Sequence, residues 1–179
     1  MQAQEILDFW FEELDGTHRF AKDPGLDAMM RERFGAVLQS AARGELFKWR
    51  TTPQGRLAEI IVLDQFSRKI HRDTAAAFTQ DAQALTLAQE LVASGQDYVL
   101  DAARRGFAYM PYMHSESPLI HAQAVALFSQ VGMESTLAYE QRHKAIIDRF
   151  GRYPHRNAVL GRASTAEEWA FLSQPGSSF

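Results

Sequence analysis

The stretch from Thr52 to His71 constrains the fold of this chain more than any other. Thr52 followed by Pro53 is typical of a helix start, because a threonine hydroxyl caps free backbone amides and proline fits the first turn. A helix that is apolar on almost every side must be enclosed by other elements. We therefore expect this helix in the middle of the fold. Its apolar residues are Leu57, Ile60, Ile61, Val62, Leu63, Phe66 and Ile70.

The rest of the chain shows a period of about 3.6 residues, which is typical of amphipathic helices. The spacing of Ser164 and Glu167 predicts a capping box that opens a last helix through Leu172. No stretch alternates with period two over the length of a strand, so the fold is predicted to be all-α. The other helices are expected over residues 6–14, 26–43, 79–94, 97–109 (ending near Pro111), 117–131 and 134–150.

Short loops between seven or eight helices imply antiparallel neighbours. The chain has no 34-residue repeat and no tetratricopeptide consensus, so a tetratricopeptide-like superhelix of helical hairpins and an irregular bundle both stay open. At 179 residues the chain is expected to form one domain over residues 1–179. The Gln-Pro-Gly-Ser-Ser-Phe end predicts a frayed tail over residues 173–179.

Composition argues against several classes of function. A net charge of −3 argues against nucleic-acid binding, which needs a broadly basic surface. The absence of cysteine excludes disulfides, thiolate catalysis and zinc–thiolate sites, and is consistent with a cytoplasmic protein. Neither a signal peptide nor a membrane span is expected, because the longest aliphatic run is only Ile60–Leu63. The sequence leaves cofactors, metals and oligomeric state unassigned.

Basic residues are concentrated near the C-terminus. Between Arg142 and Arg162 there are six lysines and arginines against one acid, in a chain with 19 basic and 22 acidic residues. Such a segment can hold a bound anion or form an internal network of ion pairs, and the sequence weighs these evenly. The candidate ligand-binding residues here are Arg152, Arg156, Asn157 and Arg162, with His155 as a candidate catalytic residue.

Polar residues also stand where the helical period expects apolar ones. His143 falls near the centre of the stripe formed by Tyr139, Ile146, Ile147 and Phe150. An inward histidine must find partners. It is either a satisfied core histidine or a ligand or proton-transfer group.

Asp64, Arg68 and His71 share one face of the central helix, at i, i+4 and i+7. They are interpreted as a buried structural network in preference to a ligand site. His114 and Glu116 lie in a break between two helices, where they suit two metal ligands, an acid–base pair, or simply a helix end and turn.

His18 and His121 are expected to be incidental, because His18 lies in a loop and His121 at the edge of an apolar stripe.

Three segments carry a resemblance to a known family: Leu63-Asp64-Gln65-Phe66-Ser67-Arg68, Tyr109-Met110-Pro111 with His114-Ser115-Glu116, and the block from His143 to Glu168. Together they resemble an uncharacterised bacterial family, domain of unknown function nine hundred and twenty-four. The resemblance implies an all-helical, tetratricopeptide-like fold and no known activity. The chain departs from the family pattern at Ser67, where proline is expected, and at Lys69 and His71, where asparagine and tyrosine are expected.

Three hypotheses for function follow. The first is a small-molecule site in a helical crevice for binding or hydrolysis of an anionic ligand, with Glu116 or a histidine as base and arginines holding the anion. The second is a helical module that binds a peptide without chemistry. The third is a purely structural polar network that locks the last helices to the central one.

Overall fold

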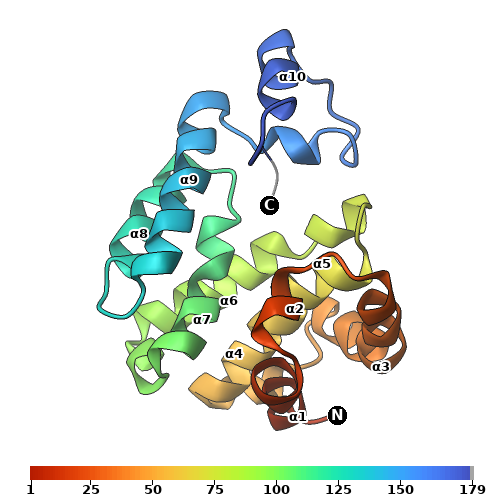
Figure 1. Cartoon of the computed structure of the whole chain (residues 1–179). Coiled ribbons are helices and arrows are strands. Elements are labelled where there is room, and N and C mark those ends of the chain that lie inside the picture. The colour runs from red at the N-terminus through yellow and green to blue at the C-terminus, as the bar shows by residue number, and fades with distance from the viewer. Residues whose placement is uncertain (178–179) are drawn as a thin grey trace.

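The computed structural model describes residues 1–177, and throughout that range every regular element is a helix or helical turn, which confirms the predicted all-α class (Figure 1). The α-helices are α1 Ala3–Asp8, α2 Gly16–Phe20, α3 Pro24–Ala42, α4 Pro53–Ile61, α5 Ser67–Ile70, α6 Asp81–Ala93, α7 Ala102–Met113, α8 Pro118–Phe128, α9 Glu134–Phe150 and α10 Ala166–Leu172. Short 3-10 turns lie at Phe47–Thr51, Ala75–Phe78, Gln96–Val99 and Pro154–Arg156.

The central helix lies where the sequence predicts it, but it has three parts. α4 begins with the Thr52 hydroxyl accepting a hydrogen bond from the Gly55 amide at 3.1 Å. A π-helical turn, Val62–Phe66 (η3), then leads into α5. Such turns are rare and occur often at functional sites. α4 contacts α1, α6 and α7, which accounts for the burial of its apolar residues.

Aromatic rings fill the core around η3. Phe66 packs against Phe34 at 4.9 Å and against Trp10 at 5.7 Å between ring centroids. Phe9, in a second π-helical turn over Phe9–Glu13 (η1), lies 4.6 Å from Phe34. All four side chains are buried. The first three quarters of the chain thus fold around one apolar core.

The helix expected over residues 97–109 differs from the structure at both ends. Residues 96–99 form a 3-10 turn, and α7 begins after Asp101, whose carboxylate accepts a hydrogen bond from the Arg104 amide at 2.9 Å. The predicted end near Pro111 is wrong, because Pro111 lies inside α7. A proline in the last turn removes few hydrogen bonds, and the His114 amide still closes the helix on the Met110 carbonyl.

The C-terminal helices follow their capping signals closely. Gly151 ends α9 with φ of 68°, in the left-handed region where glycine is favoured. The capping box of α10 lies one residue later than expected: the Thr165 hydroxyl accepts from the Glu168 amide, and the Glu168 carboxylate accepts from the Thr165 amide. Tyr139 is 54% exposed, so its expected place on the inward stripe of α9 is wrong.

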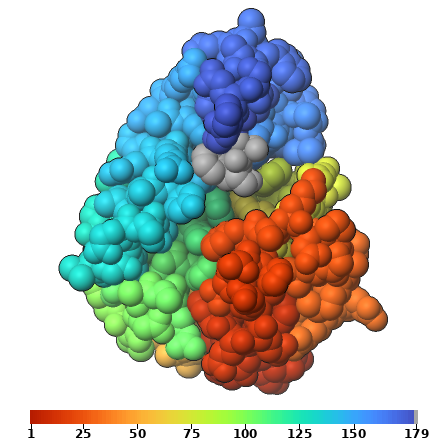
Figure 2. Space-filling model, viewed as in Figure 1, coloured from red at the N-terminus to blue at the C-terminus, as the bar shows by residue number. Residues whose placement is uncertain are grey.

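α1 lies at the bottom of the molecule and α10 at the top in the view of Figures 1 and 2. Segment 151–177 stands above the body in this view, beside α9. Within the predicted tail, the Ser177 hydroxyl donates to the Leu172 carbonyl at 3.1 Å, whereas residues 178 and 179 lie outside the described range. Over the described residues, no helix has the length and apolar character needed to cross a membrane.

Candidate functional site

The candidate site is built on Asp64, which η3 buries to 1% exposure. His114 Nδ1 lies 2.6 Å from Asp64 Oδ1, and Arg68 Nη1 lies 3.1 Å from the same oxygen. Gln65 Nε2 donates to the other oxygen at 2.5 Å. Burial alone would raise the pKa of Asp64, but the Arg68 charge and the His114 contact hold it well below its usual range. Asp64 is therefore a carboxylate at neutral pH.

His114 follows the last residue of α7, and its ring is oriented by Asp64. A carboxylate only accepts hydrogen bonds, so His114 Nδ1 carries the proton and Nε2 has a free lone pair. Burial, together with the Arg68 charge, lowers the pKa of His114. The imidazole is therefore neutral at pH 7, and its side chain keeps 15% exposure. A neutral, oriented and accessible imidazole can accept a proton.

Two arginines share one acid beside this pair. Arg68 donates to both carboxylate oxygens of Asp81, at 2.9 and 3.0 Å. Arg156 donates to Asp81 at 3.2 Å and to the His114 carbonyl at 3.0 Å. The Arg156 guanidinium lies over Phe78 at 4.6 Å and over Tyr153 at 4.5 Å. Asp81 was absent from the sequence-based candidates, because an acid in the first turn of a helix is ordinary.

Glu116 is held firmly by its neighbours. Arg162 donates to both of its oxygens, at 2.6 and 2.9 Å, and the Tyr153 amide donates at 2.8 Å. Burial tends to raise the pKa of Glu116, yet these hydrogen bonds lower it. A carboxylate occupied in this way is a weak base. The geometry fits a positioning role for Glu116 better than the proton-transfer role suggested by its sequence position.

The remaining basic candidates fasten the C-terminal segment. Arg162 Nε donates to Asn157 Oδ1 at 3.0 Å, and Asn157 Nδ2 donates to the Ser164 hydroxyl at 3.0 Å. Arg152 donates to both oxygens of Glu168, at 2.7 and 2.8 Å. The predicted set of arginines is thus paired with acids, which is the internal network that the sequence left open.

His143 and His155 both lie against Tyr153, with ring centroids 5.8 and 5.5 Å away. His143 Nδ1 donates to the Tyr139 carbonyl at 2.8 Å, one turn earlier in α9. Burial lowers the pKa of His143 to about 3 and that of His155 to about 4. Both rings are therefore neutral at physiological pH.

The expectation that His121 is incidental is wrong. His121 and Glu140 are both fully buried, with His121 Nδ1 2.7 Å from Glu140 Oε1 and Nε2 2.8 Å from the Ser115 carbonyl. A carbonyl only accepts, so Nε2 carries a proton and the second proton is shared between Nδ1 and the carboxyl group. Burial raises the pKa of Glu140, which favours keeping that proton.

The sequence held a signal for this pair. His121 lies three and seven residues before Ala124 and Phe128, which are buried on the inner face of α8. Glu140 lies three residues before His143 on the inner face of α9. Helical spacing alone places both residues on inward stripes, where a polar side chain requires a partner.

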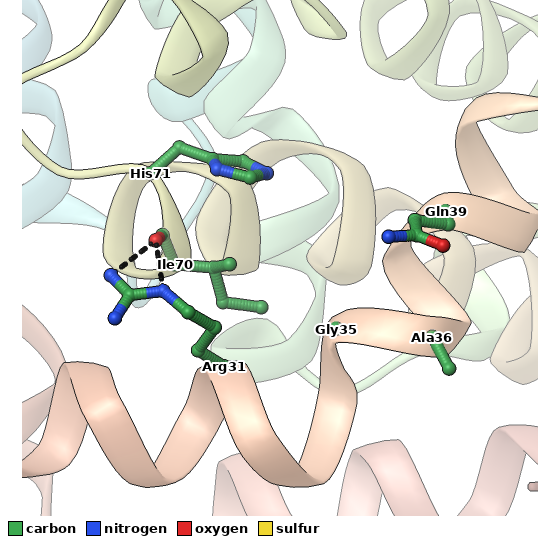
Figure 3. A pocket seen from close by; sticks show the side chains of 6 residues that line it. All are labelled: Arg31, Gly35, Ala36, Gln39, Ile70 and His71. Atoms are coloured by element: carbon green, nitrogen blue, oxygen red, sulfur yellow. Dashed lines mark hydrogen bonds between the residues drawn. The ribbon is translucent and has the colours of Figure 1, made fainter.

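Neither a metal cluster nor a deep pocket marks the site. Within residues 1–177, no three histidine, aspartate or glutamate side chains are placed to hold a metal ion. One hollow of about 360 Å³ lies between α3 and the end of α5 (Figure 3), and another of about 620 Å³ lies between α9 and α10. Neither Asp64 nor His114 lines either hollow, whereas His71, which the sequence grouped with Asp64 and Arg68, lines the first. The Asp64–His114 pair lies instead at a half-buried junction between segments.

These observations define an all-helical protein with an apolar body and a C-terminal segment attached by buried ion pairs. Over residues 6–176 the chain matches the family described as bacterial protein of unknown function (DUF924), and it belongs to that family. It is similar to a solved structure of a protein of unknown function from Agrobacterium tumefaciens, with 34% sequence identity over 96% of each chain and a TM-score of 0.90. The comparison with curated proteins gives no significant match.

Proposed function

We propose that this protein binds a small anionic ester beside His114 and hydrolyses it with His114 as general base. The observation that carries the proposal is the Asp64–His114 pair, in which a buried carboxylate fixes one ring nitrogen and leaves the other available. The lowered pKa keeps the His114 ring neutral and able to accept a proton at neutral pH, and its side chain keeps 15% exposure.

The chemistry follows from the protonation states. His114 Nε2 takes a proton from a water molecule as the water oxygen bonds to the carbonyl carbon or phosphorus of the ester. The bond from that atom to the leaving oxygen then breaks, and the imidazolium returns its proton to the leaving oxygen. Asp64 stabilises the imidazolium formed between these two steps.

Arg156 is the best candidate to hold the anion. It is buried to 6% exposure, and within the described residues its Nε–H group is buried with no hydrogen-bond acceptor. A buried donor without an acceptor is costly, and a ligand oxygen would remove that cost. Arg68 and Arg156 share Asp81, so neither arginine has that carboxylate to itself.

The purely structural network is the second candidate, because Arg68, Arg152, Arg156 and Arg162 are all paired with acids. Under that reading the polar residues stabilise the fold and nothing binds beside His114. The two candidates differ in what His114→Asn should do.

The test is a thermal-shift panel of phosphate and carboxylate esters on untagged protein, followed by hydrolysis assays with any ester that raises the Tm. His114→Asn keeps a donor for Asp64 but removes the ring nitrogen that accepts the proton. We expect this variant to fold and to lose hydrolysis, whereas His18→Asn, in an exposed position, should behave as wild type. A ligand at 100 times its Kd adds about 2.7 kcal/mol, which is readily measured. Equal hydrolysis by His114→Asn and wild type contradicts the proposal.

A further inference from the structure

The hollow between α3 and α5 is separate from the His114 site. Figure 3 shows Gly35 and Ala36 on α3 forming one wall, with Ile70 and His71 at the end of α5 opposite. Its volume of about 360 Å³ lies within the range of small-molecule sites. Arg31 and Gln39 stand on the same helix, one turn to either side of Gly35.

Gly35 has no structural need to be glycine. It lies inside α3, it is absent from the positive-φ positions, and a Cβ built on it meets nothing within 4 Å. Glycine inside a helix is less favourable than alanine or leucine. The consequence of glycine here is open space above the helix, which is where the hollow lies.

Arg31 supplies a positive charge at the edge of the hollow. Its Nε and Nη2 atoms donate to the Ile70 carbonyl at 3.2 and 2.8 Å, which fixes the plane of the guanidinium (Figure 3). Among the described residues no acid lies within ion-pair distance of Arg31, in contrast to Arg33 on the same helix, which pairs with Glu13. A fixed guanidinium without an acid partner suits a carboxylate or phosphate.

His71 and Gln39 point toward each other across the hollow in Figure 3. Burial and the Arg31 charge lower the pKa of His71, so its ring presents one donor and one acceptor at neutral pH. The side-chain amide of Gln39 likewise offers a hydrogen-bond donor and an acceptor. The Gln39 and His71 side chains thus offer hydrogen bonds on two sides of the hollow, which Ile70 also lines.

We infer that this hollow binds a small molecule that carries a carboxylate or phosphate group. Arg31 holds the anionic oxygens, Gln39 and His71 bond the polar atoms of the ligand, and its apolar part rests on Gly35, Ala36 and Ile70. The site lies apart from the residues of the proposed hydrolysis, so either assignment can fail without the other.

Isothermal titration calorimetry with benzoate and phenylphosphonate tests the site, because the two probes share a ring, differ in the anion and are not esters. We expect saturable binding of at least one probe to wild type at millimolar concentrations. Arg31→Gln should lose it, since no guanidinium remains, while Arg33→Gln on the same helix should keep it.

Gly35→Leu provides a second variant that leaves Arg31 untouched. Leucine fills the hollow and favours the helix, so this variant should have a higher Tm than wild type and no probe binding. His114→Asn should bind the probes as wild type does. Two results overturn the inference: no saturable binding of either probe to wild type, or equal binding by wild type, Arg31→Gln and Gly35→Leu.

Discussion

The body of the molecule and its C-terminal segment are held together in different ways. The body buries one large apolar cluster that extends from Ile6 to Met133, with Phe66 and Trp10 near its middle. The second cluster has only three buried members, Ile146, Ile147 and Tyr153. The segment after α9 is attached chiefly by charged hydrogen bonds, such as Arg162 to Glu116. Apolar burial tolerates changes of pH, whereas paired charges require particular protonation states.

The largest effect is expected in the apolar body. Phe66→Ala removes a fully buried ring that contacts Phe9, Trp10 and Phe34, and should lower the free energy of unfolding by about 3–5 kcal/mol. Phe20→Ala is the matched control, because that ring is 66% exposed. Urea unfolding measures both variants. If Phe66→Ala lowered the free energy of unfolding no more than Phe20→Ala, the stability of the body would not depend on this core.

The junction between body and segment should be nearly as sensitive. Arg68→Ala leaves the buried Asp64 and half-buried Asp81 without their shared partner, and should cost about 3 kcal/mol. A double-mutant cycle with Asp81→Ala isolates the pair. The exposed pair Arg43–Glu45 is the control, and Arg43→Ala should change little. A coupling energy near zero between Arg68 and Asp81 would show that this pair, on the body side of the junction, does not stabilise the fold.

Low pH should destabilise the C-terminal part of the molecule, around His143 and His155, more than the apolar body. The folded-state pKa values of His143 and His155 lie at about 3 and about 4, below the usual 6.5. Their stabilisation is therefore complete above pH 6.5 and is lost as the pH falls from 6.5 toward about 4, on the order of 1–3 kcal/mol.

Denaturation midpoints measured across this range test the acid effect. The double variant His143→Asn with His155→Asn should show a flatter pH dependence than wild type. His18→Asn, which changes an exposed histidine, should retain the wild-type slope. An unchanged slope in the double variant would rule out these two rings as the source.

The smallest effect is local. Arg152 fixes the start of α10 through Glu168, whose side chain is 3% exposed, so Arg152→Ala should speed amide hydrogen exchange in residues 166–172 several-fold. Arg149→Ala removes a more exposed pair with Glu167 and should change the exchange less. Equal exchange in the two variants would mean that the Arg152–Glu168 pair does not hold α10.

The sequence predicted the helices well because their signals are local. Caps such as Thr52 and Gly151 act over one turn, and they appear in the structure where the sequence placed them. Pro111 was misjudged because the cost of a proline depends on its place in the helix, and the true end of α7 could not be read from the residue type. The π-helical turns at Phe9–Glu13 and Val62–Phe66 have no local sequence signal.

The polar contacts were harder to predict because they join distant segments. The sequence identified Asp64, His114 and Glu116 as polar residues worth attention, but it could not pair Asp64 with His114 across fifty positions. Asp81 was missed because an acid in the first turn of a helix is ordinary, and Glu140 was missed although its spacing from His143 places it on the inner face of α9. Which polar side chains pair depends on how the helices pack, and that packing could not be read from this one sequence.

His114 has two partners from distant segments. Asp64 contacts its ring, and Arg156 donates a hydrogen bond to its carbonyl. These partners come from η3 in the middle of the chain and from the 3-10 turn Pro154–Arg156 near its end. The arrangement therefore forms only when residues 64–156 have folded together, because Asp64 and Arg156 stand at the two ends of that span. The Arg156 contact forms only after the segment near residue 156 has packed against α7, so a chain that stops before residue 156 cannot complete it.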